Sequence, residues 1–162
     1  MSKKIFVSRC LIGYKCAYDG GARYADPVKR LCDKFGYAGL CPEMAGGLGC
    51  PREAHEIVDG SGEDVLDGKA RVVSFSGEDH TGQFLRGARA ALETVLKNDI
   101  SIAIMRSRSP SCGKGKIHSG KFNGVLREGN GVTAALFLRS GISVFTENDS
   151  TTVRQILETS RT

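Results

Sequence analysis

Four short apolar segments, separated by stretches with helical patterns, constrain the fold of this sequence more than any other feature. The segments are Ile5–Val7, Tyr37–Leu40, Ser101–Met105 and Ser143–Thr146. Short apolar strands that alternate with helices are typical of a parallel sheet covered on both faces. We therefore predict an α/β fold with a mostly parallel, loosely Rossmann-like sheet and flanking helices.

Capping residues and apolar spacing place the helices between these strands. Asp26 is the expected N-cap of one helix, Pro27 its first residue and Gly36 its end. Three further helices are predicted over residues 79–96, 132–138 and 150–157.

The remaining segments have weaker patterns. Two short strands, 56–58 and 70–74, are predicted on either side of a polar turn at residues 60–64. Residues 42–52 are rich in glycine and proline and are predicted as a loop. Residues 113–131 contain six glycines and are predicted as an irregular loop or a hairpin.

The length and composition of the chain favour a single globular domain. With 162 residues, of which 40% are hydrophobic, the chain can bury a core without disulfide bonds. We predict a domain over residues 1–149 and a C-terminal helix or tail over 150–162. No apolar stretch approaches the ~20 residues that span a bilayer. The first residues lack a signal-peptide core, so we expect a cytoplasmic protein with reduced cysteines.

Three of the six cysteines follow predicted strands. Cys10, Cys41 and Cys112 come after the first, second and third apolar segments. Ligands of open α/β sheets bind outside the carboxyl ends of the strands, so we expect these thiols to meet there. Soft thiolates in that place can hold a metal or a cluster and leave one coordination position free. The alternative role, a small buried hydrophobe, suits Cys16, Cys32 and Cys50 better.

Several familiar motifs are incomplete. Residues 115–121 have the spacing of a nucleotide-binding P-loop, but Phe122 stands where a Ser or Thr must meet magnesium. Neither Cys10 nor Cys112 is followed six residues later by the arginine of a cysteine phosphatase. No C-x-x-C pair is present, which argues against a zinc ribbon and a redox dithiol.

Histidines and basic residues give weaker signals. The histidines lie apart in polar segments, and we expect all three to be exposed and idle: His55, His80 and His118. The formal net charge is +5, a mild bias towards anionic partners. Basic residues gather near Cys112 and fit either a solvated loop or a rim that attracts phosphate: Arg106, Arg108, Lys114, Lys116 and Lys121.

Seven motifs, in order along the chain, resemble the thiouracil desulfidase (TudS) family, long known only as a bacterial domain of unknown function. The resemblance covers residues 5 to 147. The motifs are Ser8-Arg9-Cys10-Leu11-Ile12-Gly13, Tyr18-Asp19-Gly20-Gly21, Cys41-Pro42-Glu43-Met44-Ala45-Gly46-Gly47-Leu48, Pro51-Arg52, Gly62-Glu63-Asp64-Val65-Leu66-Asp67-Gly68, Arg108-Ser109-Pro110-Ser111-Cys112-Gly113 and Gly131-Val132-Thr133-Ala134-Ala135-Leu136.

The resemblance implies a cofactor and a reaction. The cofactor is a 4Fe-4S cluster bound by three cysteines, with one open iron that takes the sulfur of the substrate. Carried over by motif, its ligands are Cys10, Cys41 and Cys112. The expected reaction is a non-redox desulfuration of a thiolated pyrimidine, such as 2- or 4-thiouracil, to the oxo base and hydrogen sulfide.

The resemblance also implies roles for residues around the cluster. Glu43 matches the catalytic acid of the family, and Ser109 matches its active-site serine. Asp19 and Ser111 are expected to bind substrate. Cys50 could compete as a fourth ligand and close the open iron, and the sequence does not tell whether Cys50 or Cys16 contributes to the site.

Other functions stay open on the sequence alone. One is a non-enzymatic iron–sulfur or metal-binding protein, and another is a zinc hydrolase that uses the same thiolates. A third is a desulfidase that acts on thiolated tRNA or on nucleosides derived from it, with the basic loop as the contact surface. We favour free bases or nucleosides, because the chain is too short for a separate RNA-binding domain. The sequence does not define the oligomeric state.

Overall fold

Four parallel strands form the central sheet. The computed structural model describes residues 3–159 of the chain. The strands β1 (Ile5–Ser8), β2 (Tyr37–Leu40), β5 (Ile102–Met105) and β8 (Ser143–Thr146) lie in the order β2-β1-β5-β8. Every pair in this sheet is parallel. The predicted α/β fold is therefore confirmed.

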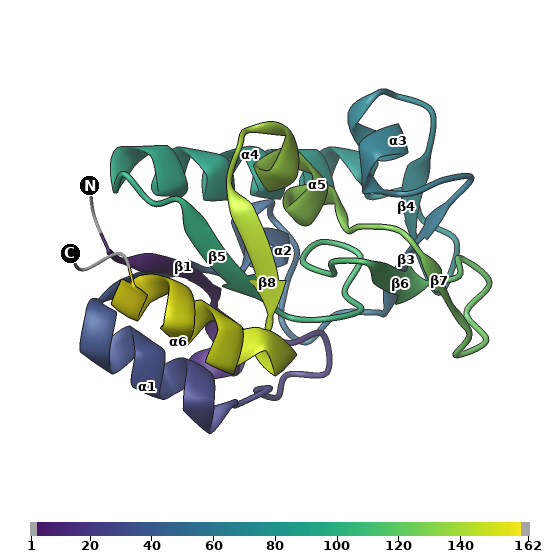
Figure 1. Ribbon diagram of the computed structural model, residues 1–162. Coiled ribbons are helices and arrows are strands. Elements are labelled where there is room, and N and C mark those ends of the chain that lie inside the picture. The colour runs from purple at the N-terminus through teal and green to yellow at the C-terminus, as the bar shows by residue number, and fades with distance from the viewer. Residues whose placement is uncertain (1–2, 160–162) are drawn as a thin grey trace.

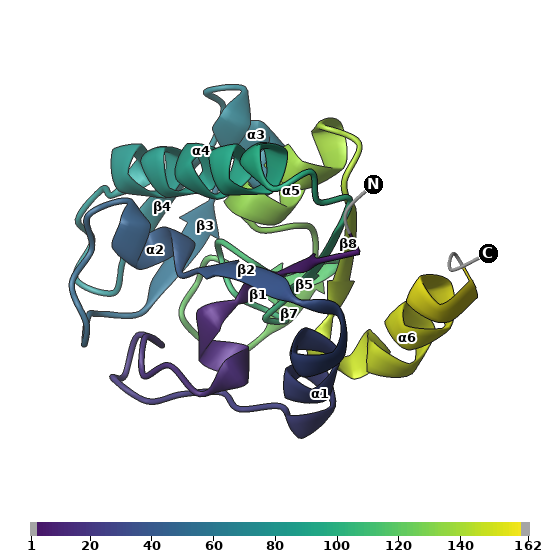
Figure 2. The ribbon, with the colours of Figure 1, turned by 90° about the vertical axis from the view of Figure 1, so that its left-hand side faces the viewer.

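Helices cover both faces of this sheet (Figures 1 and 2). One face carries α1 (Asp26–Phe35) and α6 (Ser150–Thr159), and the other carries α4 (Thr81–Lys97) and α5 (Val132–Arg139). Alternate residues of each strand point to opposite faces. Accordingly, one core cluster contains Val7, Leu31 and Val153, while the other contains Phe6, Val95 and Phe137.

The predicted ends of the chain extend past the described residues. Helix α6 begins at Ser150, where the sequence predicts it, and ends at Thr159. The domain predicted over 1–149 and the tail predicted over 150–162 include residues 1–2 and 160–162, which lie outside the described part. Within residues 3–159, none of the helices is both long enough and apolar enough to cross a bilayer.

A smaller region packs beside the main sheet. It contains the antiparallel pair β3 (His55–Val58) and β4 (Arg71–Ser74), and the hairpin β6 (Lys116–His118) and β7 (Leu126–Glu128). A third core cluster lies beneath it and includes Ile57, Val72, Phe84 and Ile117. The glycine-rich stretch after Cys112 thus forms a hairpin, one of its two predicted alternatives.

The prediction of a polar turn at residues 60–64 was wrong. This segment instead leads into a short helix, α3 (Gly62–Leu66). Ser61 caps the helix, and the carboxylate of Asp64 accepts the N–H of Ser61 at 2.8 Å. This capping box satisfies backbone N–H groups that a short helix leaves unpaired. The composition of this segment is also typical of a turn, since the same polar residues occur in turns and at the starts of helices.

Another short helix interrupts the loop predicted at residues 42–52. Helix α2 (Pro42–Ala45) follows Cys41 directly and packs against α4. Two glycines permit this close approach. A Cβ on Gly46 would lie 1.9 Å from the carbonyl oxygen of Gln83, and a Cβ on Gly87 would lie 1.9 Å from that of Pro42. Any larger residue at either position would push α2 away from α4.

Candidate active site

The three strand-end cysteines line one small cavity. Cys10 lies in the 3₁₀ turn η1 (Arg9–Ile12) after β1, and Cys41 directly follows β2. Cys112 lies in the loop that follows β5. Because β2, β1 and β5 are neighbours in the sheet, their carboxyl ends bring the thiols together around a cavity of 20 Å³. The predicted convergence of these residues is therefore observed.

The loop that carries Cys112 is held by the start of α5. The N–H of Val132 donates to the carbonyl of Pro110, and the N–H groups of Thr133 and Ala134 donate to that of Ser111. The first N–H groups of a helix have no partner within it, so the loop satisfies them. A Cβ on Gly131 would lie 2.5 Å from the backbone of Ser111, which explains the glycine there.

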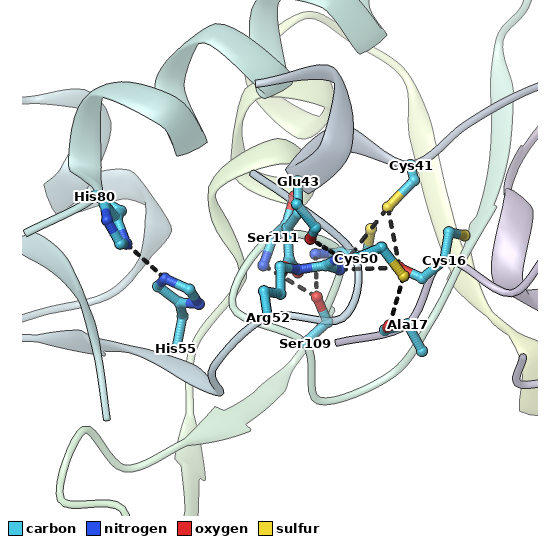
Figure 3. Close-up of polar contacts among 12 residues, drawn as sticks. Cys16, Ala17, Cys41, Glu43, Cys50, Arg52, His55, His80, Ser109 and Ser111 are labelled. Carbon is cyan, nitrogen blue, oxygen red and sulfur yellow. Dashed lines mark hydrogen bonds and ion pairs between the residues drawn. The ribbon is translucent and has the colours of Figure 1, made fainter. Parts of the chain in front are cut away.

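Ser109 serves this same loop. Its hydroxyl oxygen accepts the N–H of Ser111 at 3.1 Å and the N–H of Cys112 at 3.0 Å (Figure 3). These two bonds fix the backbone of the cysteine. The hydroxyl proton is not used by either bond, and Ser109 lines the cavity. One side chain can therefore shape the loop and still donate a hydrogen bond.

A fourth cysteine, Cys16, also lines the small cavity. Contact with the Cys10 thiol is the main cause that raises the pKa of Cys16 to about 11. The Cys16 thiol and then burial raise the pKa of Cys41. Burial raises the pKa of Cys112 to about 12. Without a bound cation, the site therefore favours neutral thiols.

Cys50 lies apart from this group. Its thiol is directed at the carbonyl oxygens of Lys15, at 3.2 Å, and Ala17, at 3.5 Å (Figure 3). It does not line the small cavity. Cys16, rather than Cys50, is therefore the further cysteine that lines the cavity with the three motif cysteines.

Glu43 forms a buried ion pair with Arg52. The Nε of Arg52 lies 2.9 Å from Oε1 of Glu43, and both side chains are largely buried (Figure 3). Arg52 also donates to the carbonyls of Gly49 and Cys16, each at 3.0 Å, and approaches the sulfur of Cys41 to 4.0 Å. These bonds fix Arg52, so that Arg52 in turn fixes one oxygen of Glu43. The sequence contained this arginine in a motif but gave it no role.

A larger cavity adjoins the thiols. Its volume is 510 Å³, within the range of small-molecule sites. Glu43, Arg106 and Ser109 line both cavities and so form the junction between them. Arg106 and Arg108 of the basic cluster line the larger cavity, whereas its three lysines are exposed. The lysines thus fit a solvated loop, while the two arginines belong to the cavity wall.

The prediction for the histidines was wrong. His55 is 6% exposed, lies on β3, and lines the larger cavity together with His118. Its Nε2 lies 2.7 Å from Nδ1 of His80 (Figure 3). Burial lowers the pKa of His55. The strand predicted from the sequence began at residue 56, one residue after His55, so His55 was assigned to the polar segment before it.

The predicted substrate-binding residues lie at different places. Asp19 accepts from Arg23 at 2.8 Å and from the N–H of Gly21 at 3.0 Å. Arg23 is the main cause that lowers the pKa of Asp19 to about 2. Arg23, rather than Asp19, lines the larger cavity. Ser111 is buried and its hydroxyl lies 2.8 Å from that of Thr133.

Fold and site together define a class of protein. A parallel sheet gathers buried thiols at its carboxyl edge, and a carboxylate stands between them and a cavity of ligand size. This arrangement is typical of an α/β enzyme whose chemistry depends on a thiolate-bound centre.

Comparison with known proteins identifies the family. The profile of the 2-thiouracil desulfurase family matches residues 5–149, so the chain belongs to that family. "Uncharacterized protein YbbK" of Bacillus subtilis (strain 168) is 42% identical over 145 residues, which are 90% of this chain and 96% of that protein. The solved structure of the 4Fe-4S-dependent thiouracil desulfidase TudS is similar, with a TM-score of 0.85 and 38% identity. The match covers 97% of this chain and 99% of that one. The resemblance predicted from the motifs is confirmed.

Proposed function

We propose that this chain removes sulfur from a thiolated pyrimidine of the 2- or 4-thiouracil type. Water replaces the sulfur at the ring carbon, so the products are the oxo base and hydrogen sulfide, without net electron transfer. One observation carries the proposal: the thiols of Cys10, Cys41 and Cys112 and the carboxylate of Glu43 meet where a thiol-lined cavity adjoins a cavity of ligand size. Membership in the 2-thiouracil desulfurase family supports it.

The thiols suit a 4Fe-4S cluster, and Cys10, Cys41 and Cys112 would hold it. They are soft sulfur ligands in a buried place, which iron–sulfur clusters favour. Within residues 3–159, no three His, Cys, Asp or Glu side chains surround a single metal-ion position. A cluster has another requirement, since each thiolate binds a separate iron. Bound through these three thiolates, the cluster would supply one open iron as a Lewis acid for the soft substrate sulfur.

Glu43 is the proposed acid–base residue. Its carboxylate lies at the junction of the two cavities, where the thiocarbonyl carbon and an attacking water would meet. There it takes a proton from the water as the C–O bond forms, and returns it as the C–S bond breaks. Arg52 restricts this carboxylate to one orientation through its bond to Oε1. A fixed base needs little reorganisation during the reaction.

Ser109 is proposed to orient the pyrimidine. Its oxygen is occupied by two backbone N–H groups, so its proton can be donated to a ring oxygen or nitrogen. We propose that Asp19 acts on the substrate through Arg23, which it positions at the cavity wall. A contact between substrate and Ser111 stays a prediction.

The proposed substrates are free bases or nucleosides, including nucleosides derived from thiolated tRNA. A cavity of 510 Å³ is of suitable size for either. The cytoplasm is the proposed location, since its reducing conditions keep thiols available to a cluster.

The test begins with protein reconstituted with iron and sulfide without oxygen. It should show broad iron–sulfur absorption and convert 2- or 4-thiouracil to uracil with release of sulfide. Cys112→Ala should lose both the absorption and the turnover. Cys50→Ser is the matched control, because its thiol lies outside the cavity and a hydroxyl can still donate to the carbonyls of Lys15 and Ala17.

Three results would contradict the proposal. Full turnover by Cys112→Ala would contradict the role of Cys112 as a cluster ligand. Turnover by a zinc-loaded, iron-free sample would favour the zinc hydrolase. A reversible redox signal in the absence of turnover, together with indifference to Glu43→Gln, would favour a non-enzymatic iron–sulfur protein.

A further inference from the structure

The backbone of Phe122 has a conformation that aromatic residues rarely adopt. Its φ is +53°, in the left-handed region. A bulky side chain is strained there, and such strain persists only where the surrounding structure imposes it. Phe122 lies between the strands of the β6–β7 hairpin and lines the large cavity. The strained residue therefore lies at the proposed substrate site.

A buried carboxylate holds Phe122 in this conformation. Oε1 of Glu56 accepts the N–H of Gly120 at 2.8 Å and the N–H of Phe122 at 3.1 Å. Glu56 lies on β3 and is 7% exposed. Gly120 lies so close to β3 that a Cβ on it would be 2.5 Å from the carbonyl oxygen of Ile57. The hairpin is thus fastened to the adjacent strand at the residues that carry the ring.

A second aromatic ring meets Phe122 from another element. Phe75 follows β4, and its ring centroid lies 5.6 Å from that of Phe122, at an interplanar angle of 80°. Its turn is also held by a carboxylate, because Glu53 accepts both the N–H and the hydroxyl of Ser76. Phe75 lines the same cavity and is 71% exposed. Two aromatic rings in mutual contact therefore line the cavity, with apolar surface still in contact with water.

We infer that Phe75 and Phe122 form an aromatic clamp that binds the ring of the substrate and sets the preference for a planar base. The inference rests on the proposed function. A planar pyrimidine has a π-face, and stacking on an aromatic side chain does not depend on which ring carbon carries the sulfur. The clamp supplies contact area, while Glu43 and Ser109, on the same cavity, supply the polar groups. Rigid positioning of Phe122 lowers the entropy lost on binding.

The test compares two substrates and three variants. 2-Thiouracil is planar and aromatic, and 5,6-dihydro-2-thiouracil has the same thiocarbonyl on a saturated, puckered ring. Phe122→Asn removes the ring and retains a residue that tolerates the left-handed region. Phe75→Leu removes the second ring and keeps apolar bulk. Val125→Ala is the control, since Val125 lies on the same hairpin, is exposed and does not line the cavity.

The wild-type protein should have a KM for the planar substrate about fivefold or more below that for the dihydro compound, the lower range of base–aromatic stacking. Phe122→Asn and Phe75→Leu should remove most of this difference while kcat for 2-thiouracil changes less than about twofold. Uracil binding, measured by calorimetry without turnover, should weaken in parallel. Thermal stability of Phe122→Asn should equal or exceed that of wild type, because the strain is relieved.

The outcomes separate the clamp from the proposed function. If wild type turns over thiouracil and both variants keep its KM and its preference, the clamp is overturned and the function stands. If no turnover occurs but uracil binds and the variants lose this binding, the clamp stands and the function falls. If Val125→Ala weakens binding as much as Phe122→Asn, the effect belongs to the hairpin as a whole and the clamp is overturned.

Discussion

The contact between α2 and α4 gives the sharpest structural prediction. Gly87→Ala places a methyl group 1.9 Å from the carbonyl oxygen of Pro42, whereas real Cβ contacts stay above 3.0 Å. The two helices must therefore separate by about 1 Å, since the atoms nearest to the added methyl group all belong to the backbone and cannot move like a flexible side chain. Glu43 lies on α2, so the change would move the proposed acid–base residue without touching it.

The expected cost follows from two opposing effects. Overpacking of a close contact costs about 1–3 kcal/mol. Alanine is favoured over glycine inside a helix by about 1 kcal/mol, which offsets part of that loss. A net loss of up to about 2 kcal/mol lowers the melting temperature of a chain of this size by up to about 8 °C. A displacement of about 1 Å at a catalytic group lowers turnover by about 100-fold.

Gly82→Ala on the same helix is the matched control. A Cβ there meets only the flexible end of Arg86, at 3.5 Å. This variant should be as stable as wild type or slightly more stable, and it should keep full activity. Melting curves and thiouracil turnover of both variants decide the matter. If Gly87→Ala has the same melting temperature as Gly82→Ala and keeps its activity, the close packing does not position Glu43, and the reasoning fails.

Three further predictions concern single residues. Arg52→Met should lower the free energy of unfolding by about 2–3 kcal/mol, because Glu43 is left partly buried without its partner. Urea titrations measure this loss, and the double variant Arg52→Met with Glu43→Gln should lose less than the sum of the two single losses. Ser109→Ala should lower the free energy of unfolding by about 1–2 kcal/mol, because two backbone N–H groups lose their acceptor, and it should also lower turnover. Unchanged stability would show that the Ser109 hydroxyl does not hold the loop. Burial raises the pKa of Cys32 from 9.0 to about 12, so the folded state favours the neutral thiol, and the stability it contributes is lost as pH rises above 9. Wild type should lose about 1.4 kcal/mol more than Cys32→Ala between pH 8 and pH 10, and parallel pH profiles would contradict this.

The sheet was predictable because its information is local. Each strand of the main sheet is a short apolar run, and each helix beside it repeats apolar residues on one face. The small helix α3 was missed because five residues show no period, and its capping box uses residues that also form turns. The hairpin stayed one of two alternatives, since its strands have only three residues each.

The residues of the site were predictable only where they follow a strand. The three cysteines could be predicted to meet because each follows a strand, and parallel strands end at one edge. Arg52 stood in a motif, but nothing local indicated its role, which is defined by bonds to the carboxylate of Glu43 and to the carbonyl of Cys16. The left-handed backbone of Phe122 likewise depends on Glu56, 66 residues away in the sequence. Side chains defined by distant partners have no short-range pattern to detect.

The placement of Glu43 joins these two kinds of information. Helix α2 has four residues, too few to be stable alone, so its direction must come from tertiary packing. Gly46 and Gly87 set its distance from α4, and Arg52 sets the orientation of the carboxylate. A motif can therefore identify Glu43, but the position of its oxygen atoms depends on contacts with Gly87 of α4 and with Arg52, which the spacing within the motif does not define. It follows that variants of Gly87 and Arg52 should impair the reaction as variants of Glu43 do, although they leave every group that touches the substrate chemically unchanged.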